Sequence, residues 1–325
     1  MSVQTFENIT DYLGPPERRF FSAGYKRARY ILGAAELDTT PETVRYRNAL
    51  TVRYPSDWST KDAGDQRPHL STVDALVIAL RVCSQLLGRS DNTDNTSVSL
   101  GKIVVSSGMA PQEDLTDIPV TAHLSTKAEP TGGSTAVGKF KCHVGSLKVT
   151  LTLDDCDHPL AERREPTLPV KDTPDATDYW MDGFRTCTHD IRSVHLDTTD
   201  RTATAAVFLD MPDTLRRDYG TLPSPKVPFV EGFVVSLQLA QMLIYEYDAM
   251  DRGSSNTLWM IRTTLKPALA AKPVDGIPAR TRLTNVESVA VHGRTHRYVE
   301  FHSTVGDVEV AAQFAHDITH LAARA

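Results

Sequence analysis

Two acidic residues occupy matching places in two similar stretches of the chain. Asp74 lies within 73–80 and Glu231 within 230–237; a Pro-containing loop precedes each stretch, and an apolar segment typical of a buried helix follows it. In the first turn of a helix, the helix dipole stabilises a carboxylate. Partial desolvation there raises the pKa of the carboxyl group, which suits it to proton transfer. Both acids are therefore candidate catalytic residues; the alternative is that they only stabilise the helix ends.

His69 precedes the first acid by five positions and is the third candidate catalytic residue. An Asp–His pair can share a proton near neutral pH. The segment 64–69 is similar to the Gly-Asp-x-Asn-Pro-x-His motif of hot-dog hydratases, but it is one residue shorter and has Arg67 in place of the Asn. The second half has no matching histidine, so a single active site would lie in the first half. The alternative is a loop histidine with no role.

Arg81 and Gln238 stand at equivalent positions in the two apolar segments, seven residues after the acids. Burying such polar groups without partners costs about 1–3 kcal/mol each. We expect them either to bind a thioester carbonyl or a sugar, or to pair with a residue of the other half.

Cationic and aromatic residues of the second half are further candidates for substrate binding. Arg252, Arg262 and Lys266 are suited to holding a phosphate or a pantetheine arm, unless they are solvated surface charges. Trp259 is either a core residue or a platform for a sugar.

Several other motifs fail as functional sites. His316–His320 is similar to the H-E-x-x-H zinc motif, but Asp317 replaces the glutamate and five residues remain to supply a third ligand. The cluster 154–158 has no second ligand group, and the loop 131–134 lacks the flanking strand and helix of a nucleotide-binding loop. No Gly-x-Ser-x-Gly elbow is present, which argues against an α/β-hydrolase. We therefore expect no metal site.

The elements that position these residues follow the same order twice. In each half, the hydrophobic periodicity predicts two strands, a long helix and then three strands. Residues 69–87 and 229–248 are the expected helices, with Ser71 or Thr72 as the N-cap of the first. The expected strands are 27–38, 45–54, 102–107, 118–127, 138–153, 184–196, 202–211, 258–265, 279–291 and 297–314, the last interrupted by a turn at 305–307.

This repeated order predicts an α+β protein, a double hot-dog in which two antiparallel sheets each wrap a long central helix. The Pro-rich and charged stretch 154–179 is the expected linker. It separates an N-terminal hot-dog, residues 1–153, from a C-terminal hot-dog, residues 180–325. Fusing both copies in one chain replaces the usual homodimer, although a homodimer of the whole chain is also compatible with the sequence.

Composition places the chain among ordinary globular proteins, with 40% hydrophobic and 23% charged residues. The net charge of −6 gives no electrostatic reason to expect nucleic acid or an anionic membrane as partner. The four cysteines form no C-x-x-C pair, which favours a reducing compartment over a disulfide scaffold. No signal core and no run of about 18 apolar residues is present. We expect a soluble, cytoplasmic protein.

Several blocks of the sequence resemble the avirulence D (AvrD) family. They are Asp11–Pro15, Arg19–Phe21 with the following Gly24-Tyr25, and 230–265 with its segments Leu237–Gln241 and Asn256–Met260. The resemblance implies an enzyme that builds syringolide-type lactones by joining a β-ketoacyl thioester to a ketose. The A-factor biosynthesis (AfsA) proteins, a related hot-dog pair, join a β-ketoacyl carrier to a triose phosphate. The resemblance assigns no catalytic residue.

From the resemblance we expect an enzyme of bacterial secondary metabolism that transfers a β-ketoacyl group from CoA or an acyl carrier protein to a small ketose or triose. Asp74 or Glu231 would be the base, with His69 assisting. An apolar groove beside the helices would hold the acyl chain, since each buried CH₂ contributes about 0.8 kcal/mol. No metal or redox cofactor is implied. The alternatives are a hot-dog dehydratase or thioesterase, and a non-catalytic acyl-binding module.

Overall fold

The computed structural model describes the greater part of the chain. The described residues are 3–40, 42–59, 67–87, 99–108, 111–127, 137–154, 167–168, 179, 181–212, 227–253, 255, 258–269, 275–291 and 293–319. Most of the expected linker and the loop 131–134 lie outside them, as do His320 and all of the cluster 154–158 except Asp154. No helix among the described residues is long and apolar enough to cross a membrane.

Two long helices form where the sequence predicts them. They are α3 (Thr72–Leu86) and α5 (Phe229–Tyr247), and nearly all their side chains are buried. Ser71 is the N-cap of α3: its hydroxyl accepts a hydrogen bond from the backbone N–H of Asp74 at 3.1 Å. A helix that is apolar on most faces must be enclosed by other elements, which explains the burial.

The remaining elements are short helices and strands. The N-terminal segment contains β1 (Val3–Asn8), α1 (Thr10–Leu13), η1 (Pro16–Arg18), the π-helical turn η2 (Phe20–Gly24) and α2 (Tyr25–Arg27). The rest of the first half adds β2 (Arg29–Leu32), β3 (Ala35–Thr39), β4 (Thr43–Arg53), β5 (Ser99–Ser106), β6 (Ile118–Lys127), β7 (Val137–Val144), β8 (Leu147–Asp154) and β9 (Thr167–Leu168). The second half adds η5 (Gly183–Arg185), β10 (Thr188–Asp197), β11 (Thr202–Asp210), β12 (Trp259–Pro267), β13 (Ile277–Val291), β14 (Arg294–Val305) and β15 (Val308–Asp317).

The expected single strand 138–153 is wrong, because this segment is the hairpin β7–β8. Gly145 lies at the turn with φ +56°, a left-handed conformation that favours glycine. The expected strand 27–38 likewise divides into β2 and β3, and both pair with β4. The expected turn at 305–307 is confirmed: Gly306, with φ +55°, separates β14 from β15.

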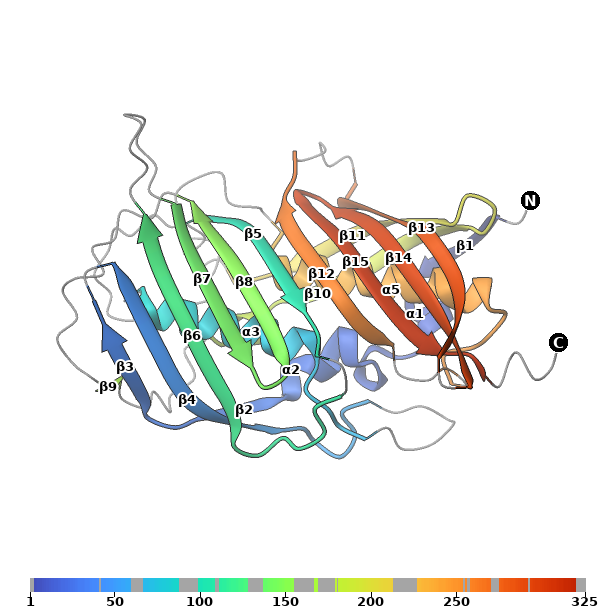
Figure 1. Cartoon of the computed structure of the whole chain (residues 1–325). Helices are drawn as coiled ribbons and strands as arrows, with labels where there is room; N and C mark the ends of the chain where they lie inside the picture. The colour runs from blue at the N-terminus through green and yellow to red at the C-terminus, as the bar shows by residue number, and fades with distance from the viewer. Residues whose placement is uncertain are drawn as a thin grey trace.

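All strands join one antiparallel sheet (Figure 1). Its order is β1-β10-β11-β13-β14-β15-β12-β5-β8-β7-β6-β4-β3-β9, with β2 also on β4. The two halves meet where β12 pairs with β5, for example at Thr263 and Val105. The α+β class with a large antiparallel sheet is therefore confirmed. The division into domains at 154–179 stays a prediction, and β1, from the N-terminal end, pairs with β10 of the second half.

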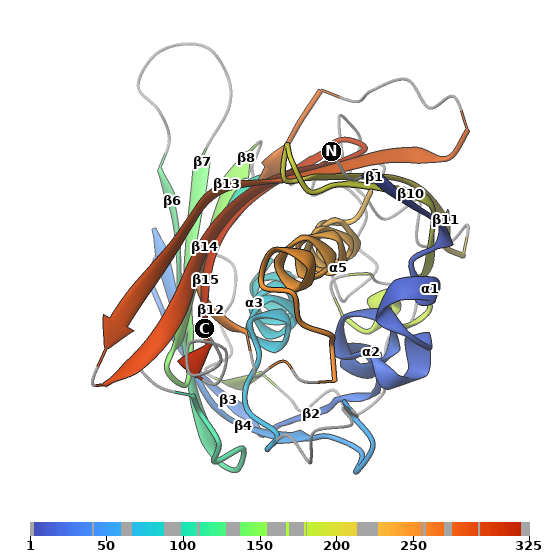
Figure 2. The ribbon, with the colours of Figure 1, turned by 90° about the vertical axis from the view of Figure 1, so that its right-hand side faces the viewer.

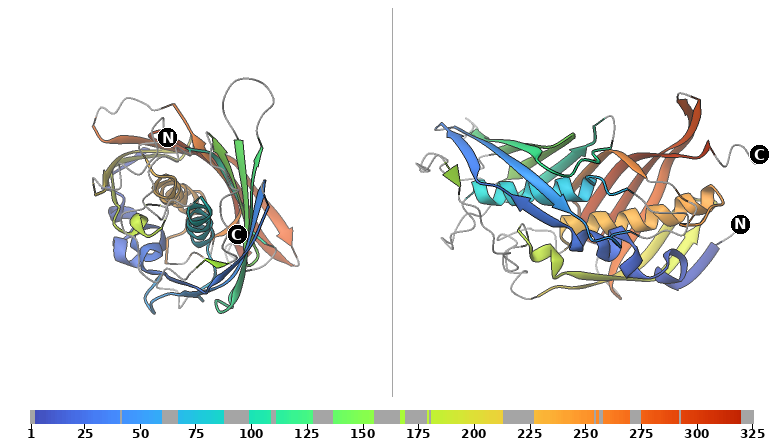
Figure 3. Two further views of the ribbon diagram at one scale, coloured as in Figure 1. Left: turned by 90° about the vertical axis from the view of Figure 1, so that its left-hand side faces the viewer. Right: turned by 90° about the horizontal axis from the view of Figure 1, so that it is seen from below.

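The sheet curves around both helices (Figure 2). Helix α3 packs on β5 to β8, whereas α5 packs on β10 to β15, and the two helices contact each other. Views from the other side and from below show the helices together on the concave face of the sheet (Figure 3). A single cluster of buried apolar side chains runs through both halves. This core fixes the starts of the two helices relative to the N-terminal segment that covers them.

Candidate active site

The carboxylate of Asp74 is wholly buried and surrounded by donors at the start of α3. Its Oδ1 accepts from the Tyr30 hydroxyl at 2.7 Å, and its Oδ2 accepts from the Tyr54 hydroxyl. Oδ2 also accepts from the backbone N–H of Ser71 at 2.8 Å and from its hydroxyl at 2.6 Å, which completes a capping box. Both carboxylate oxygens are thus used as acceptors by neighbouring groups of the protein. Asp74 therefore fixes the helix start.

Glu231 is buried at the start of α5 in a different environment. The hydroxyls of Tyr25 and Tyr179 donate to its carboxyl group, the former at 3.4 Å. Burial raises the pKa of Glu231 to about 8, although the nearby ammonium group of Lys26 acts in the opposite direction. Glu231 is thus largely protonated near neutral pH. Burial is the largest influence on this carboxyl group and disfavours its charge.

Arg81 pairs with the other half of the chain. A guanidinium nitrogen of Arg81 lies 3.9 Å from the carboxylate of Asp182, and both side chains are buried. Asp182 is also bound by Arg185 at 2.8 Å. Of the two roles expected for Arg81, substrate binding or pairing with the other half, the structure shows the pairing.

Gln238 is saturated by contacts inside the protein. Its Oε1 accepts from Nη1 of Arg19 at 2.7 Å, while its Nε2 donates to the carbonyl groups of Phe21 and Val234. The same nitrogen lies 3.0 Å from Nε2 of His189, whose pKa burial lowers to about 3, so that this ring is neutral. Gln238 thus positions Arg19.

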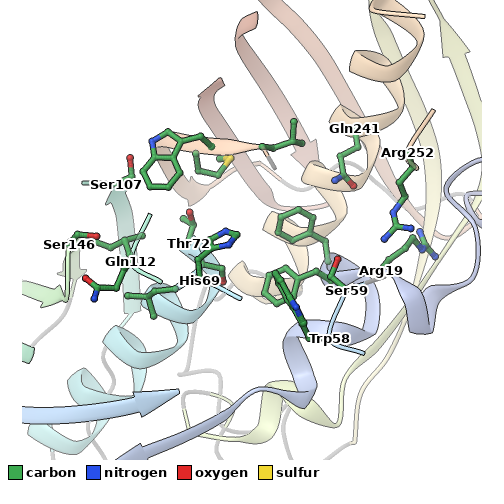
Figure 4. A pocket seen from close by; sticks show the side chains of 18 residues that line it. Arg19, Trp58, Ser59, His69, Thr72, Ser107, Gln112, Ser146, Gln241 and Arg252 are labelled. Carbon is green, nitrogen blue, oxygen red and sulfur yellow. The ribbon is translucent and has the colours of Figure 1, made fainter. Parts of the chain in front are cut away.

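A cavity of about 90 Å³ lies between the two halves, at the start of α3 (Figure 4). This volume accommodates several groups the size of a water molecule. Neither Asp74 nor Glu231 lines it. Its walls comprise Arg19, Phe20, Phe21, Trp58, Ser59, His69, Leu70, Ser71, Thr72, Ser107, Gln112, Ser146, Leu147, Gln241, Arg252, Leu258, Trp259 and Met260. The long apolar groove expected beside the helices stays a prediction.

His69 is the candidate base that the structure brings to the cavity. Its Nδ1 lies 3.2 Å from the carbonyl oxygen of Arg67. A carbonyl oxygen only accepts, so Nδ1 is the donor in this contact, and in the neutral ring the lone pair is then on Nε2. The ring packs edge-on against Trp58 at 6.0 Å between centroids. The expected pairing of His69 with Asp74 does not form: the tyrosines and Ser71 occupy that carboxylate.

Aromatic side chains form one wall of the cavity, the aromatic wall. Phe20 packs edge-on against Phe21 and Trp58, with centroids 5.3 and 5.4 Å apart, and Tyr54 lies 5.0 Å from Trp58. Trp259, at the start of β12, also lines the cavity and is partly exposed, so it is not a core residue. This wall provides an apolar surface next to His69.

Two arginines stand at one end of the cavity (Figure 4). Arg19 is only 4% exposed, and its Nε is buried without an acceptor among the described residues. Arg252 donates to the backbone carbonyl of Arg18 at 2.6 Å, which holds its guanidinium beside Arg19. Arg262 and Lys266 lie elsewhere: Arg262 is exposed on β12, and Lys266 pairs with Glu309 at 2.8 Å.

Reasoning from the sequence did not assign a role to Arg19 or Trp58. Arg19 belongs to the block Arg19–Phe21 that resembles the AvrD family, and this was the available signal. Trp58 lies in a loop without regular pattern, so nothing in the sequence placed it beside His69.

The zinc-like motif of β15 serves a structural contact. Nε2 of His316 lies 3.1 Å from the carboxylate of Asp248, which also accepts from Nε of Arg297 at 2.9 Å. Within the described part of the chain, no group of three or more His, Cys, Asp or Glu side chains is arranged to hold a metal ion. Three cysteines in that part, Cys83, Cys142 and Cys187, are buried.

Distant likenesses to solved structures span most of the chain. A dehydratase domain of a mycocerosic acid synthase-like polyketide synthase is 14% identical with a TM-score of 0.40, covering 88% of this chain and 94% of that one. Acyl-CoA thioesterase II TesB2 from Mycobacterium marinum is 9% identical (TM-score 0.36; 87% and 96%). A hot-dog-fold protein of unknown function from Alicyclobacillus acidocaldarius is 12% identical (TM-score 0.34; 92% and 97%).

Sequence comparison gives a closer relationship. No curated protein matches the chain. The model of one family, described as Pseudomonas avirulence D protein (AvrD), matches residues 4–295. Because this match spans nearly the whole sequence, the chain belongs to the AvrD family.

Proposed function

We propose that this protein is an enzyme of bacterial secondary metabolism that acts on acyl thioesters. It transfers a β-ketoacyl group to a hydroxyl of a small ketose or triose, after which condensation closes a lactone ring of the syringolide or butyrolactone type. Membership of the AvrD family supports the general class of this proposal. The thioester comes from CoA or an acyl carrier protein. Because a thioester is already an activated acyl donor, the reaction needs no metal or redox cofactor.

We also propose that the fold is a double hot-dog. Two features support this assignment: the order of strands and helix repeats in the two halves, and the halves share one antiparallel sheet through β5 and β12. Each long helix packs on the strands of its own half. In this arrangement the cavity lies where the first half meets the second.

The observation that carries the proposal is the placement of His69 in the cavity at the start of α3. Its Nε2 lone pair is suited to accept the proton of an attacking hydroxyl. The first N–H groups of an α-helix lack acceptors within the helix, so that of Thr72, which lines the cavity, is suited to stabilise the oxyanion that forms on the thioester carbonyl. The aromatic wall excludes water, which would otherwise hydrolyse the thioester.

These groups balance one reaction step. The acceptor hydroxyl loses its proton to Nε2 of His69, and its oxygen forms a bond to the thioester carbonyl carbon. The carbon–sulfur bond then breaks, and His69 returns the proton to the departing sulfur. Asp74 acts through the structure: it fixes Ser71 and the helix start, and thereby the position of Thr72. This replaces the role as base that the sequence suggested for Asp74.

One experiment separates this function from its rivals. Purified protein is incubated with a β-ketoacyl thioester and a panel of ketoses and trioses, and the products are read by mass. An ester or lactone that contains both substrates supports the proposal. Free acid formed equally with and without sugar indicates a thioesterase. Loss of water from a 3-hydroxyacyl thioester indicates a dehydratase. Binding without turnover indicates an acyl-binding module.

A further inference from the structure

We propose that Arg19 and Arg252 form an anion subsite at one end of the cavity, and that this subsite holds a phosphate group of the substrate. The residues come from separate parts of the chain, one before η2 and the other after α5, and both line the cavity (Figure 4). The choice between substrates that could carry the phosphate rests on the proposed function, whereas the existence of the subsite does not.

Arg19 has hydrogen-bonding capacity that the described part of the protein does not use. Its side chain is 4% exposed, and its one protein partner among the described residues is Oε1 of Gln238. The carbonyl groups of Phe21 and Val234 accept from the amide nitrogen of Gln238, so that Oε1 must face Arg19. A guanidinium has five N–H donors. Burying a charged group with donors left over is costly unless a ligand accepts from them.

Arg19 and Arg252 together bring two positive charges to one end of the cavity. Burial, and next the positive charge of Arg252, lower the pKa of Arg19 to about 10. No carboxylate in the described part of the chain lies within ion-pair distance of Arg19; Glu17, the acid that acts on it, is exposed. Two cations held together inside a protein repel each other, and an anion between them removes this cost.

Contacts within the protein hold both guanidinium groups in place. Gln238 fixes Arg19, and the carbonyl of Arg18 fixes Arg252. A pre-positioned pair of planar donor groups matches the oxygens of a phosphate dianion, to which arginine binds bidentately. A neutral sugar hydroxyl does not satisfy the charge of Arg19.

Two sources could bring a phosphate to this end of the cavity: a phosphorylated small acceptor, or the phosphopantetheine arm of the acyl donor. Calorimetric titration of the full-length protein separates them. The probes are glycerol 3-phosphate and pantetheine 4′-phosphate, each compared with its dephosphorylated form. We expect at least one phosphorylated probe to bind at least about tenfold more tightly than its dephosphorylated form. This factor is typical of a hydrogen bond to a charged group. The probe that shows this preference identifies the source.

The key variant is Arg252→Gln, because Arg252 is only partly buried and its replacement preserves the core. We expect it to abolish the preference for the phosphorylated probe, and Arg252→Lys to restore part of it. Arg262→Gln is the matched control: it removes the same charge from an exposed site on β12 outside the cavity and should keep the preference. Circular dichroism confirms that each variant is folded.

Two results overturn the subsite. One is that wild-type protein binds neither phosphorylated probe better than its dephosphorylated form. The other is that folded Arg252→Gln keeps the full preference. Failure of the proposed function is distinguishable: a phosphate preference without any product from a β-ketoacyl thioester retains the subsite and refutes the reaction.

Discussion

Glu231 makes the stability of this protein depend on pH in a way that one substitution should remove. The folded protein raises the pKa of Glu231 from 4.5 to about 8, mainly through burial. Between these two values the folded state holds a proton that the unfolded chain has released. Raising the pH therefore favours the unfolded state across this window. Glu231→Gln, which is neutral and similar in shape, should abolish this contribution.

The magnitude follows from linkage. One proton of difference changes the free energy of unfolding by about 1.4 kcal/mol per pH unit. Over the window from 4.5 to about 8, Glu231 thus destabilises the folded protein by about 4–5 kcal/mol in total. This is a large part of the 5–15 kcal/mol by which folded proteins are typically stable. It is far above the error of a denaturation experiment.

The assay is urea denaturation at a series of pH values from 5 to 9, for wild type and Glu231→Gln. The difference in unfolding free energy between the two should increase in favour of the variant by about 1.4 kcal/mol per pH unit and level off above pH 8. Glu36→Gln, at an exposed position of β3, is the control for the loss of a carboxyl group as such and is measured over the same pH range. A difference for Glu231→Gln that stays constant with pH would refute the buried, protonated state of Glu231.

Two further substitutions test the structure around the cavity. Asp74→Ala removes the acceptor of three hydroxyl groups and one backbone N–H. It should lower the free energy of unfolding by about 3–5 kcal/mol. A loss below about 1 kcal/mol in urea denaturation would contradict the capping box and its hydrogen bonds. Gly24→Ala places a methyl group 2.4 Å from the backbone oxygen of Trp58, so η2 must shift. We therefore expect a lower melting temperature and an altered Trp fluorescence spectrum. An unchanged spectrum and melting temperature would argue against this close approach.

The central elements were predictable because local patterns dictate them. Helices α3 and α5 are apolar on nearly every face, and Ser71 provides an N-cap, so their positions follow from the sequence alone. Strands with clear alternation, such as β6, were located to the residue. The hairpin β7–β8 was missed because buried and exposed residues alternate on both sides of the turn; the signals of the reversal are Gly145 and the shift of the buried positions from even to odd numbers.

The site was less predictable because its chemistry depends on distant contacts. Asp74 and Glu231 occupy equivalent positions, yet three hydroxyls and a backbone N–H bind the first, while burial dominates around the second. These differences arise from tyrosines on other elements, which no spacing rule connects to the acids. Arg19 likewise has meaning only once the fold places it beside Arg252. His69 was predicted as a site residue, but it contacts Arg67 and Trp58 and not the expected Asp74.

The most direct test of the account is product formation by wild type and His69→Gln. Both are incubated with a β-ketoacyl thioester and the acceptor that gives the largest product signal, and the joined product is quantified by mass. We predict that His69→Gln lowers the rate about 10²- to 10⁴-fold, as for removal of a general base. His195→Gln, at an exposed position of β10, should have no effect. Equal rates for wild type and His69→Gln, or no joined product from wild type with any acceptor, would contradict the account.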